Sequence, residues 1–355
     1  MPRLGCGLRQ NGRVVSERVG EGPGDMSTGG CAITGWGVAF PPTVVTNEDL
    51  KSIFDTTDEW IFERSGIRSR FAATGPFVTD ARTVDAGELG TTGSMAVESG
   101  RRALDAAGVA PQDVGALILC TTTPDLAVPA TSSTVAGAMG ITGGAMDLNA
   151  ACAGFTYGLI TGAALMSAGA GAVLLIGAET LTRVTNWSDR TNAFLFGDGA
   201  GAVVLEPVEG PGCLLGWHLG ADGSLVELLY AEHGSGMVMR GPEVFRKAVR
   251  ATADSARAAL DRAHVDASEI AIFVPHQANQ RIMDAVAERL GIPGERVASV
   301  IEWTGNTSSA SIPLALVDAA ERGRLQAGDL VLLSGFGAGM TFASAVWRWG
   351  PQSLS

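Results

Sequence analysis

Apolar, strand-like runs alternate with helix-like patterns along most of this chain of 355 residues. Residues 114–121 and 145–149 are strand-like, whereas residues 130–139 and 153–168 have the pattern of helices. Strands and helices that alternate in sequence are typical of α/β proteins, in which helices cover the faces of a largely parallel sheet. The sequence therefore predicts an α/β fold.

A faint internal repeat indicates two similar halves. Three apolar runs of the first half have counterparts in the second: 33–38 with 214–219, 116–119 with 271–274, and 172–177 with 330–335. A duplicated α/β unit would explain these pairs. We expect a first half at residues 31–208 and a second half at 209–355, with the seam near residues 206–211.

Residues 1–30 are rich in glycine and arginine and contain no continuous apolar segment, so they do not form a secretory signal. We expect this N-terminal extension to be disordered. Met26 is an alternative natural start, because the first strand-like run begins at Cys31.

Composition excludes several classes of protein. A chain that is 46% hydrophobic and 17% charged can bury a large core, and its net charge of −12 argues against nucleic acid as the main partner. The apolar runs are far shorter than the roughly 20 residues that span a bilayer. Five widely spaced cysteines without a Cys-x-x-Cys pair indicate neither a disulfide framework nor a metal site, so a reducing cytoplasm is the expected location.

Three motifs can together form one catalytic centre. Cys152 lies in Asp147-Leu-Asn-Ala-Ala-Cys-Ala-Gly-Phe155, His276 in Pro275-His-Gln-Ala-Asn279, and Asn306 in Gly305-Asn-Thr-Ser-Ser309. Each follows an apolar run and precedes a helical pattern. A thiol becomes a good nucleophile when a helix N-terminus and hydrogen-bonding partners stabilise its thiolate, so we expect the helix after Cys152 to lower the thiol pKa. The motifs point to acyl transfer through sulfur.

Each of these residues also has a simpler interpretation. Cys152 could be an inert core cysteine, His276 a packed structural histidine, and Asn306 an ordinary helix cap. A glycine-rich stretch at residues 197–201 resembles a phosphate loop, but a strand pattern at residues 202–205 follows it, and this favours a tight structural turn.

The three motifs, in this order and spacing, resemble the β-ketoacyl-acyl-carrier-protein synthase III family of the thiolase superfamily. Further matches are Asp55-Thr-Thr-Asp-Glu-Trp-Ile61, Arg64-Ser-Gly-Ile-Arg68, Phe196-Gly-Asp-Gly-Ala-Gly-Ala202 and Gly335-Phe-Gly-Ala-Gly339, and the resemblance covers residues 31–349. It implies a thiolase-like duplicated fold with five layers, α-β-α-β-α, and a homodimer.

The resemblance also implies a mechanism. Cys152 would take an acyl group from acyl-CoA, and His276 and Asn306 would then donate hydrogen bonds to the thioester oxygen of malonyl-acyl carrier protein while CO2 departs. The backbone N–H groups of Cys152 and Ala338 would bind the oxyanion at the acyl carbon, with Phe336 beside the thiol. No metal or organic cofactor is implied.

By the same resemblance, Trp60 and Arg190 would hold the adenine of CoA. Arg64 and Asn279 would bind its phosphates or its pantetheine arm. The alternative for each arginine is a solvated surface charge.

A local positive cluster stands out in this acidic chain. Arg246 and Arg281 match family positions that would contact the acidic acyl carrier protein, whereas Arg240, Lys247 and Arg250 could equally form a solvated helix face.

Val128 lies where some relatives have a bulky residue that projects across the dimer interface into the acyl pocket. A smaller side chain predicts tolerance of branched or medium-length starters. The sequence of residues 228–239 does not determine how deep the pocket is.

Two other functions are compatible with parts of the sequence. The acyl enzyme could transfer its group to an alcohol or amine in secondary metabolism, although the intact set of Cys152, His276 and Asn306 favours condensation. A non-catalytic scaffold would not need the three residues. The sequence does not choose between fatty-acid initiation and polyketide priming.

Overall fold

The protein is described by a computed structural model over residues 30–78, 89–208 and 212–350. Its strands are β1 (Gly30–Ala39), β2 (Thr43–Thr46), β3 (Ser69–Ala72), β4 (Val114–Cys120), β5 (Gly144–Leu148), β6 (Ala172–Thr180), β7 (Asp198–Val208), β8 (Leu214–Ala221), β9 (Leu229–Tyr230), β10 (Val238–Met239), β11 (Ile270–Pro275), β12 (Leu330–Gly337) and β13 (Thr341–Arg348).

Its α-helices are α1 (Asn47–Leu50), α2 (Asp58–Ser65), α3 (Thr92–Ala107), α4 (Thr131–Met139), α5 (Gly154–Ser167), α6 (Gly241–Ala263), α7 (Gln280–Leu290), α8 (Ile301–Thr304) and α9 (Ser311–Glu321). Short 3-10 helices are η1 (Pro111–Asp113), η2 (Leu181–Arg183), η3 (Gly223–Leu228), η4 (Ala267–Glu269), η5 (Gly294–Arg296), η6 (Ser308–Ala310) and η7 (Ala338–Met340). No helix in these ranges is both long and apolar enough to span a membrane.

Two sheets form the framework. The larger has the order β1-β7-β6-β4-β5, and the smaller, in the corresponding direction, β8-β13-β12-β11. In both sheets the first two pairs are antiparallel and the third, β6 with β4 or β12 with β11, is parallel. The runs predicted to correspond therefore lie at equivalent places in the two sheets.

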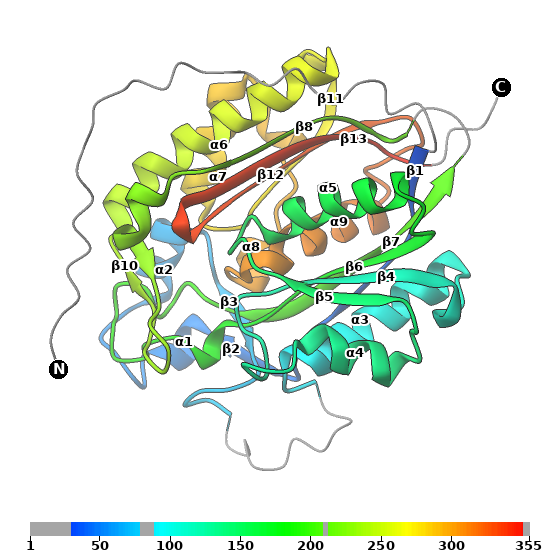
Figure 1. The fold of residues 1–355 in the computed structure, drawn as a ribbon. Coiled ribbons are helices and arrows are strands. Elements are labelled where there is room, and N and C mark those ends of the chain that lie inside the picture. The colour runs from blue at the N-terminus through cyan, green and yellow to red at the C-terminus, as the bar shows by residue number, and fades with distance from the viewer. Residues whose placement is uncertain (1–29, 79–88, 209–211, 351–355) are drawn as a thin grey trace, which may run out of the picture.

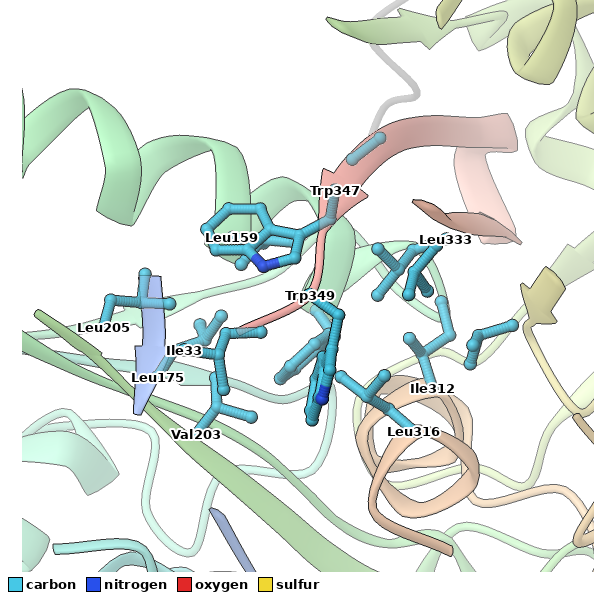
Figure 2. Close-up of a cluster of buried hydrophobic side chains, with 14 of the residues drawn as sticks. Ile33, Leu159, Leu175, Val203, Leu205, Ile312, Leu316, Leu333, Trp347 and Trp349 are labelled. Atoms are coloured by element: carbon cyan, nitrogen blue, oxygen red, sulfur yellow. The ribbon is translucent and has the colours of Figure 1, made fainter. Parts of the chain in front are cut away.

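The elements stack as five layers, as predicted (Figure 1). Helices α3 and α4 cover the outer face of the larger sheet, α5 and α9 lie between the sheets, and α6 and α7 cover the smaller sheet. The central layer is buried from both sides, and Figure 2 shows the apolar cluster around it, which includes Leu159 of α5, Ile312 of α9 and Trp347 of β13 in the smaller sheet. The thiolase-like α/β architecture is confirmed.

Glycines allow the layers to approach closely at equivalent places. A Cβ on Gly35 of β1 would overlap the carbonyl of Ala103 in α3, and a Cβ on Gly216 of β8 would overlap that of Ala259 in α6. In α5, a Cβ on Gly158 would lie 2.6 Å from the sulfur of Cys120. Helix α5 is apolar on nearly every face, which is the pattern of a fully buried helix.

Most predicted elements are confirmed within a residue or two at their ends, including β4, β5, α4 and α5. The helix expected from Thr307 begins later, at Ser311. Ser308 has φ +48°, a left-handed conformation that interrupts an α-helix.

At the N-terminus, the predicted extension lies outside the described residues except for Gly30, which is already in β1. All strands of the larger sheet come from residues 30–208 and those of the smaller from 214–348. The boundary between the two predicted halves remains a prediction, because β7 continues to Val208 and residues 209–211 are not described.

Candidate active site

One cavity of about 980 Å³ brings the three catalytic candidates together. Cys152 precedes the middle-layer helix α5, His276 follows β11 of the smaller sheet, and Asn306 precedes η6 and α9. All three line the cavity, and so do Phe336 and Ala338 at the end of β12. Residues from distant parts of the sequence therefore face a single space, which a thioester could enter.

A tight turn presents Cys152. The N–H of Ala151 donates to Oδ1 of Asn149 at 3.1 Å, and Ala151 has φ +48°, which is unusual for a residue other than glycine. Helix α5 starts two residues later, at Gly154. Asp147 of the same motif has a structural part, since its carboxylate accepts hydrogen bonds from the first N–H groups of α4, those of Thr131 and Ser132.

The pKa of the Cys152 thiol lies above its ordinary value, not below it as predicted. Burial raises this pKa to about 12, and the negative charge of Glu179 adds to the effect, while a hydrogen bond with the Ser308 side chain opposes it. The residue is only partly buried because its surface opens to the cavity. Desolvation of the thiolate is therefore the largest of these effects, and the prediction, which was based on the helix N-terminus, did not include it.

His276 is held as a buried, neutral imidazole. The side chain is 2% exposed, and burial lowers its pKa to about 3. Its Nδ1 lies 2.7 Å from Oγ of Ser311, and Phe336 packs edge-on against the ring with centroids 5.4 Å apart. A neutral imidazole has one donor and one acceptor nitrogen, so it can donate a hydrogen bond into the cavity without carrying charge.

The side chain of Gln277 holds the turn that contains His276 in place through hydrogen bonds. Its side chain is completely buried, donates to the carbonyls of Pro275 and Ala298, and accepts from the N–H of Val300. These bonds join the end of β11 to the segment that leads to Asn306. The sequence motif contained Gln277, but Ala298 and Val300 are too distant in sequence for their bonds with it to be inferred from spacing.

The carboxamide of Asn306 has a fixed orientation. Its Oδ1 accepts from the N–H of Ser308 at 2.9 Å, and a backbone N–H can pair only with the oxygen of the amide. The NH2 group is therefore the part left for a ligand. Asn306 does stabilise a turn, as its simpler interpretation proposed, but it does not cap α9 directly, since the residue before α9 is Ala310.

Cys152 and Ala338, whose backbone N–H groups are the predicted oxyanion donors, line the same cavity. Among the described backbone hydrogen bonds outside helices and strands, neither N–H is a donor. A Cβ on Gly337 would overlap the nitrogen of Cys152, so the glycine keeps this space open. Such N–H groups can stabilise a developing oxyanion.

A buried carboxylate lies behind the site and was not predicted. Glu179, at 0% exposure, accepts hydrogen bonds from the hydroxyls of Thr121, Thr122 and Thr123 and from that of Ser309 at 2.8 Å. It thereby joins the loop after β4 to the turn after Asn306. The likeness of the two turns is visible in the sequence, because Asn149-Ala-Ala-Cys-Ala153 and Asn306-Thr-Ser-Ser-Ala310 both begin with asparagine and end with alanine.

Two arginines lie over one tryptophan, and of these three residues only Arg64 lines the cavity. The guanidinium carbon of Arg64 is 4.1 Å, and that of Arg190 5.3 Å, from the ring centre of Trp60. Both arginines are exposed. Cationic planes stacked on an aromatic ring can bind a further aromatic ring or a phosphate.

Asn279 also lines the cavity, but its side chain already has protein partners. Its Nδ2 donates to the carbonyl of Arg64 at 2.7 Å, and its Oδ1 accepts from the N–H of Arg281 as the N-cap of α7. One N–H of the carboxamide is left for a ligand.

The positive cluster divides in the structure. Arg246 and Arg281 line the cavity, whereas Arg250 lies 3.6 Å from Asp254 one helical turn along α6, as in a solvated helix face. Val128 lies elsewhere: it is 86% exposed and does not line the cavity of its own chain.

The stretch at residues 197–201 is not the predicted tight turn, because residues 198–201 already belong to strand β7 and pair with β6. The N–H of Gly197 donates to the carbonyl of Asn306, and β7 follows directly. The carboxylate of Asp198 accepts from the N–H groups of Ala73 and Thr182. These donors and acceptors are used within the protein and a strand follows Gly197, so the stretch is neither a phosphate loop nor a turn but the start of β7.

Two family models match the chain. The model described as 3-oxoacyl-[acyl-carrier-protein (ACP)] synthase III matches residues 146–223, and the model of its C-terminal part matches residues 260–349. The first match contains Cys152 and the second contains His276 and Asn306.

Individual proteins match over most of the chain. A β-ketoacyl-[acyl-carrier-protein] synthase III from Erythrobacter litoralis is 45% identical over 331 residues, which are 90% of this chain and 99% of that protein. The crystal structure of 3-oxoacyl-[acyl-carrier-protein] synthase III from Aquifex aeolicus superimposes with a TM-score of 0.84 at 40% identity, covering 90% of this chain and 100% of the other. A priming β-ketosynthase of a polyketide pathway gives a TM-score of 0.82 at 35% identity, covering 91% and 97%.

Proposed function

Since the chain belongs to the β-ketoacyl-[acyl-carrier-protein] synthase III family, we propose that it condenses an acyl-CoA starter with malonyl-acyl carrier protein through an acyl group on Cys152. The observation that carries the proposal is the shared cavity, which is lined by the thiol of Cys152, the imidazole of His276 and the carboxamide of Asn306. An acyltransferase that forms a carbon–carbon bond needs a nucleophile and enolate-stabilising donors at one place.

In the first half of the proposed reaction, the sulfur of Cys152 attacks the thioester carbon of acyl-CoA. The bond from that carbon to the CoA sulfur breaks, and the thiol proton ends on CoA. The oxyanion of the tetrahedral intermediate accepts hydrogen bonds from the N–H groups of Cys152 and Ala338. The raised thiol pKa means that little thiolate exists before substrate binds, so attack and proton loss are coupled.

In the second half, malonyl-acyl carrier protein loses CO2, and the electrons of the broken bond form an enolate. His276 and Asn306 donate hydrogen bonds to its oxygen, and the carbanion attacks the acyl carbon on Cys152. The bond from that carbon to the Cys152 sulfur breaks, the β-ketoacyl product remains on the carrier protein, and the released thiolate takes up a proton from solvent. Neutral donors suit this task because they stabilise charge that exists only in the transition state and enolate. The thioester itself provides the electron sink, so the proposed chemistry needs neither a metal nor an organic cofactor.

For the substrates, we assign the Trp60, Arg64 and Arg190 cluster to the nucleotide end of CoA and Asn279 to its pantetheine arm. The spacing of 5.3 Å between Arg190 and the Trp60 ring must widen to admit an adenine between them, because two stacking distances need about 7 Å. Arg246 and Arg281 at the cavity entrance would attract the acidic carrier protein.

We also propose a homodimer that forms at β5. This strand is the edge of the larger sheet, and Met146 on it is exposed. Leu126 and Val128, in the loop after β4, are exposed as well. An apolar sheet edge of this kind favours pairing with a second copy. In that arrangement Val128 would reach the acyl pocket of the partner, and its small side chain would admit branched or medium-length starters.

A cytoplasmic location completes the proposal. Cys31, Cys120, Cys152 and Cys213 are free thiols in the structure, which suits a reducing compartment. Whether the product enters fatty-acid or polyketide synthesis depends on the starter.

The purified protein, incubated with a mixture of acyl-CoAs, tests the function by intact mass spectrometry. We expect one acyl adduct per chain, placed on Cys152 by peptide mapping, and release of CO2 with a β-ketoacyl product when malonyl-acyl carrier protein is added. Adduct without CO2 release, together with acyl transfer to an added alcohol or amine, would support the alternative acyltransferase. Absence of any adduct in folded protein would refute both.

A further inference from the structure

Ser311, the first residue of α9, lies against His276. Its side chain is completely buried, and its Oγ is 2.7 Å from Nδ1 of His276. The same oxygen is 3.2 Å from the backbone nitrogen of Gln277, whose N–H donates to it. The Ser311 hydroxyl therefore lies between a group that can only donate and a ring nitrogen that can have either role.

The available hydrogen atoms determine whether Nδ1 of His276 donates to Ser311 or accepts from it. Because the N–H of Gln277 uses the oxygen of Ser311 as acceptor, the Ser311 hydrogen must find an acceptor of its own. Among the described residues, Nδ1 of His276 is the one acceptor with which Ser311 Oγ forms a hydrogen bond. A hydrogen on Nδ1 would leave the hydroxyl of the fully buried Ser311 without an acceptor, which is unfavourable.

We propose that Ser311 is a positioning residue that donates to Nδ1 of His276 and so holds the neutral ring in the tautomer with its hydrogen on Nε2. The other nitrogen of the ring then presents a donor to the cavity that His276 lines. Burial keeps the ring uncharged, with its pKa lowered to about 3, so the choice between the two neutral tautomers is the one that matters.

If the proposed function holds, this tautomer lets His276 serve the condensation step and not the acylation of Cys152. With its hydrogen on Nε2, His276 can donate to the malonyl thioester oxygen but cannot accept the proton of Cys152. In acylation the bond between sulfur and the acyl carbon forms, the bond to the CoA sulfur breaks, and the thiol proton passes to CoA without residing on His276. The opposite tautomer would make His276 the base for Cys152.

Nitrogen-15 NMR of protein labelled at histidine tests the tautomer directly. The signals of His276 are identified by their loss in His276→Gln, which leaves those of the other three histidines. We expect wild-type Nδ1 to resonate as a bare acceptor nitrogen and Nε2 as a protonated nitrogen. A protonated Nδ1 would overturn the proposal. This spectrum needs no turnover, so it remains decisive even if the proposed function fails.

Separate rates for the two half-reactions test the consequence. In Ser311→Ala we expect release of CO2 from malonyl-acyl carrier protein to slow about tenfold, equivalent to about 1.4 kcal/mol, while acylation of Cys152 changes less than about twofold. Ser311→Thr, which keeps the hydroxyl, should recover most of the loss. Ser344→Ala is the matched control, since it removes another buried hydroxyl, 2.8 Å from that of Ser334, and should leave both rates unchanged.

Two results would contradict the proposal. Acylation that slows as much as CO2 release in Ser311→Ala would mean that His276 accepts the thiol proton. Equal losses in Ser311→Ala and Ser311→Thr would mean that the hydroxyl has no positioning role. If Ser311→Ala does not fold, the wild-type spectrum decides alone.

Discussion

The turn before α5 and the turn before α9 have the same construction but present different chemistry. In the first, Oδ1 of Asn149 accepts from the N–H two residues on, and Ala151 has φ +48°; in the second, Asn306 and Ser308 repeat both features, again with φ +48°. By this correspondence Cys152 is equivalent to Ser309. Each turn precedes a helix of the central layer.

Each turn contacts a strand from the sheet of the other half: the smaller sheet contacts the turn before α5, and the larger sheet contacts the turn before α9. A Cβ on Gly335, in the smaller sheet, would lie 2.8 Å from Cα of Ala153, and a Cβ on Gly177, in the larger sheet, would overlap the carbonyl of Ser309. Two residues beyond each glycine the halves differ. Gly337 leaves the space beside the nitrogen of Cys152 open, whereas Glu179 places a carboxylate beside the hydroxyl of Ser309.

The difference shows how one scaffold provides two functions. Where a glycine ends the strand, the fourth residue of the turn, Cys152, faces the cavity and can react. Where a glutamate occupies the corresponding place, the fourth residue, Ser309, is buried in a hydrogen-bond network, and the first residue of the turn, Asn306, lines the cavity instead. In the proposed reaction the first half thus provides the nucleophile, and the second provides neutral donors.

The largest expected effect comes from replacing the fourth residue of each turn, Cys152 or Ser309, with alanine. Cys152→Ala should abolish the acyl adduct and reduce condensation more than about 10⁴-fold, because the covalent route is lost. Ser309→Ala should still form the adduct and should cost about 1–3 kcal/mol of unfolding free energy, because it removes a buried hydrogen-bond donor of Glu179. Intact mass spectrometry and thermal unfolding measure the two. An adduct that persists in Cys152→Ala would place the nucleophile elsewhere.

A smaller but still large effect is expected at the strand-end glycine. In Gly337→Ala the new methyl group would displace the Cys152 amide from the oxyanion position, and we expect acylation to slow about 100-fold, the scale of one lost oxyanion donor. Gly137→Ala in α4 is the matched control, since nothing lies within 4 Å of its Cβ position. Stopped-flow acylation rates that are equal in the two folded variants would show that the open space is not needed.

Removing the charge of Glu179 should have a moderate effect. Glu179 raises the pKa of Cys152, so Glu179→Gln should lower this pKa and make alkylation by iodoacetamide about two- to fivefold faster at a fixed neutral pH. The protein should also lose stability, since several hydroxyls lose a charged acceptor. Alkylation measured against pH, with circular dichroism as a check of folding, gives the result. An unchanged profile would remove Glu179 from the account of the thiol.

The smallest expected change concerns pH and the donors of the second half. The pKa of His276 is lowered to about 3, so the ring is neutral above that pH and does not titrate between pH 5 and 8. Decarboxylation of malonyl-acyl carrier protein should therefore vary less than about twofold over this range. A rate step with an apparent pKa near 6.5 that disappears in His276→Gln would show a histidine that ionises.

The sequence predicted the parts of this architecture that depend on local pattern. Apolar runs located β4, β5 and α5 to within a residue or two, and the three motifs identified residues that share one cavity. The start of α9 was placed too early because a left-handed Ser308 cannot be read from composition.

Long-range effects were beyond the sequence. Glu179 and Ser309 are separated by 130 positions, and Ser311 and His276 by 35, so their hydrogen bonds become visible only after folding. The prediction that the pKa of Cys152 is lowered was wrong for the same reason. The helix N-terminus could be predicted locally, but the burial that raises the pKa depends on residues from distant parts of the chain.

The most direct test of the central claim, that one half provides the nucleophile and the other the enolate donors, is a rapid-quench mass measurement of acyl-Cys152 in Asn306→Ala. The account predicts that the adduct forms at close to the wild-type rate but that malonyl-acyl carrier protein discharges it at least about 100-fold more slowly, with a parallel loss of CO2 release. Discharge at the wild-type rate, or a folded variant that cannot be acylated, would contradict it.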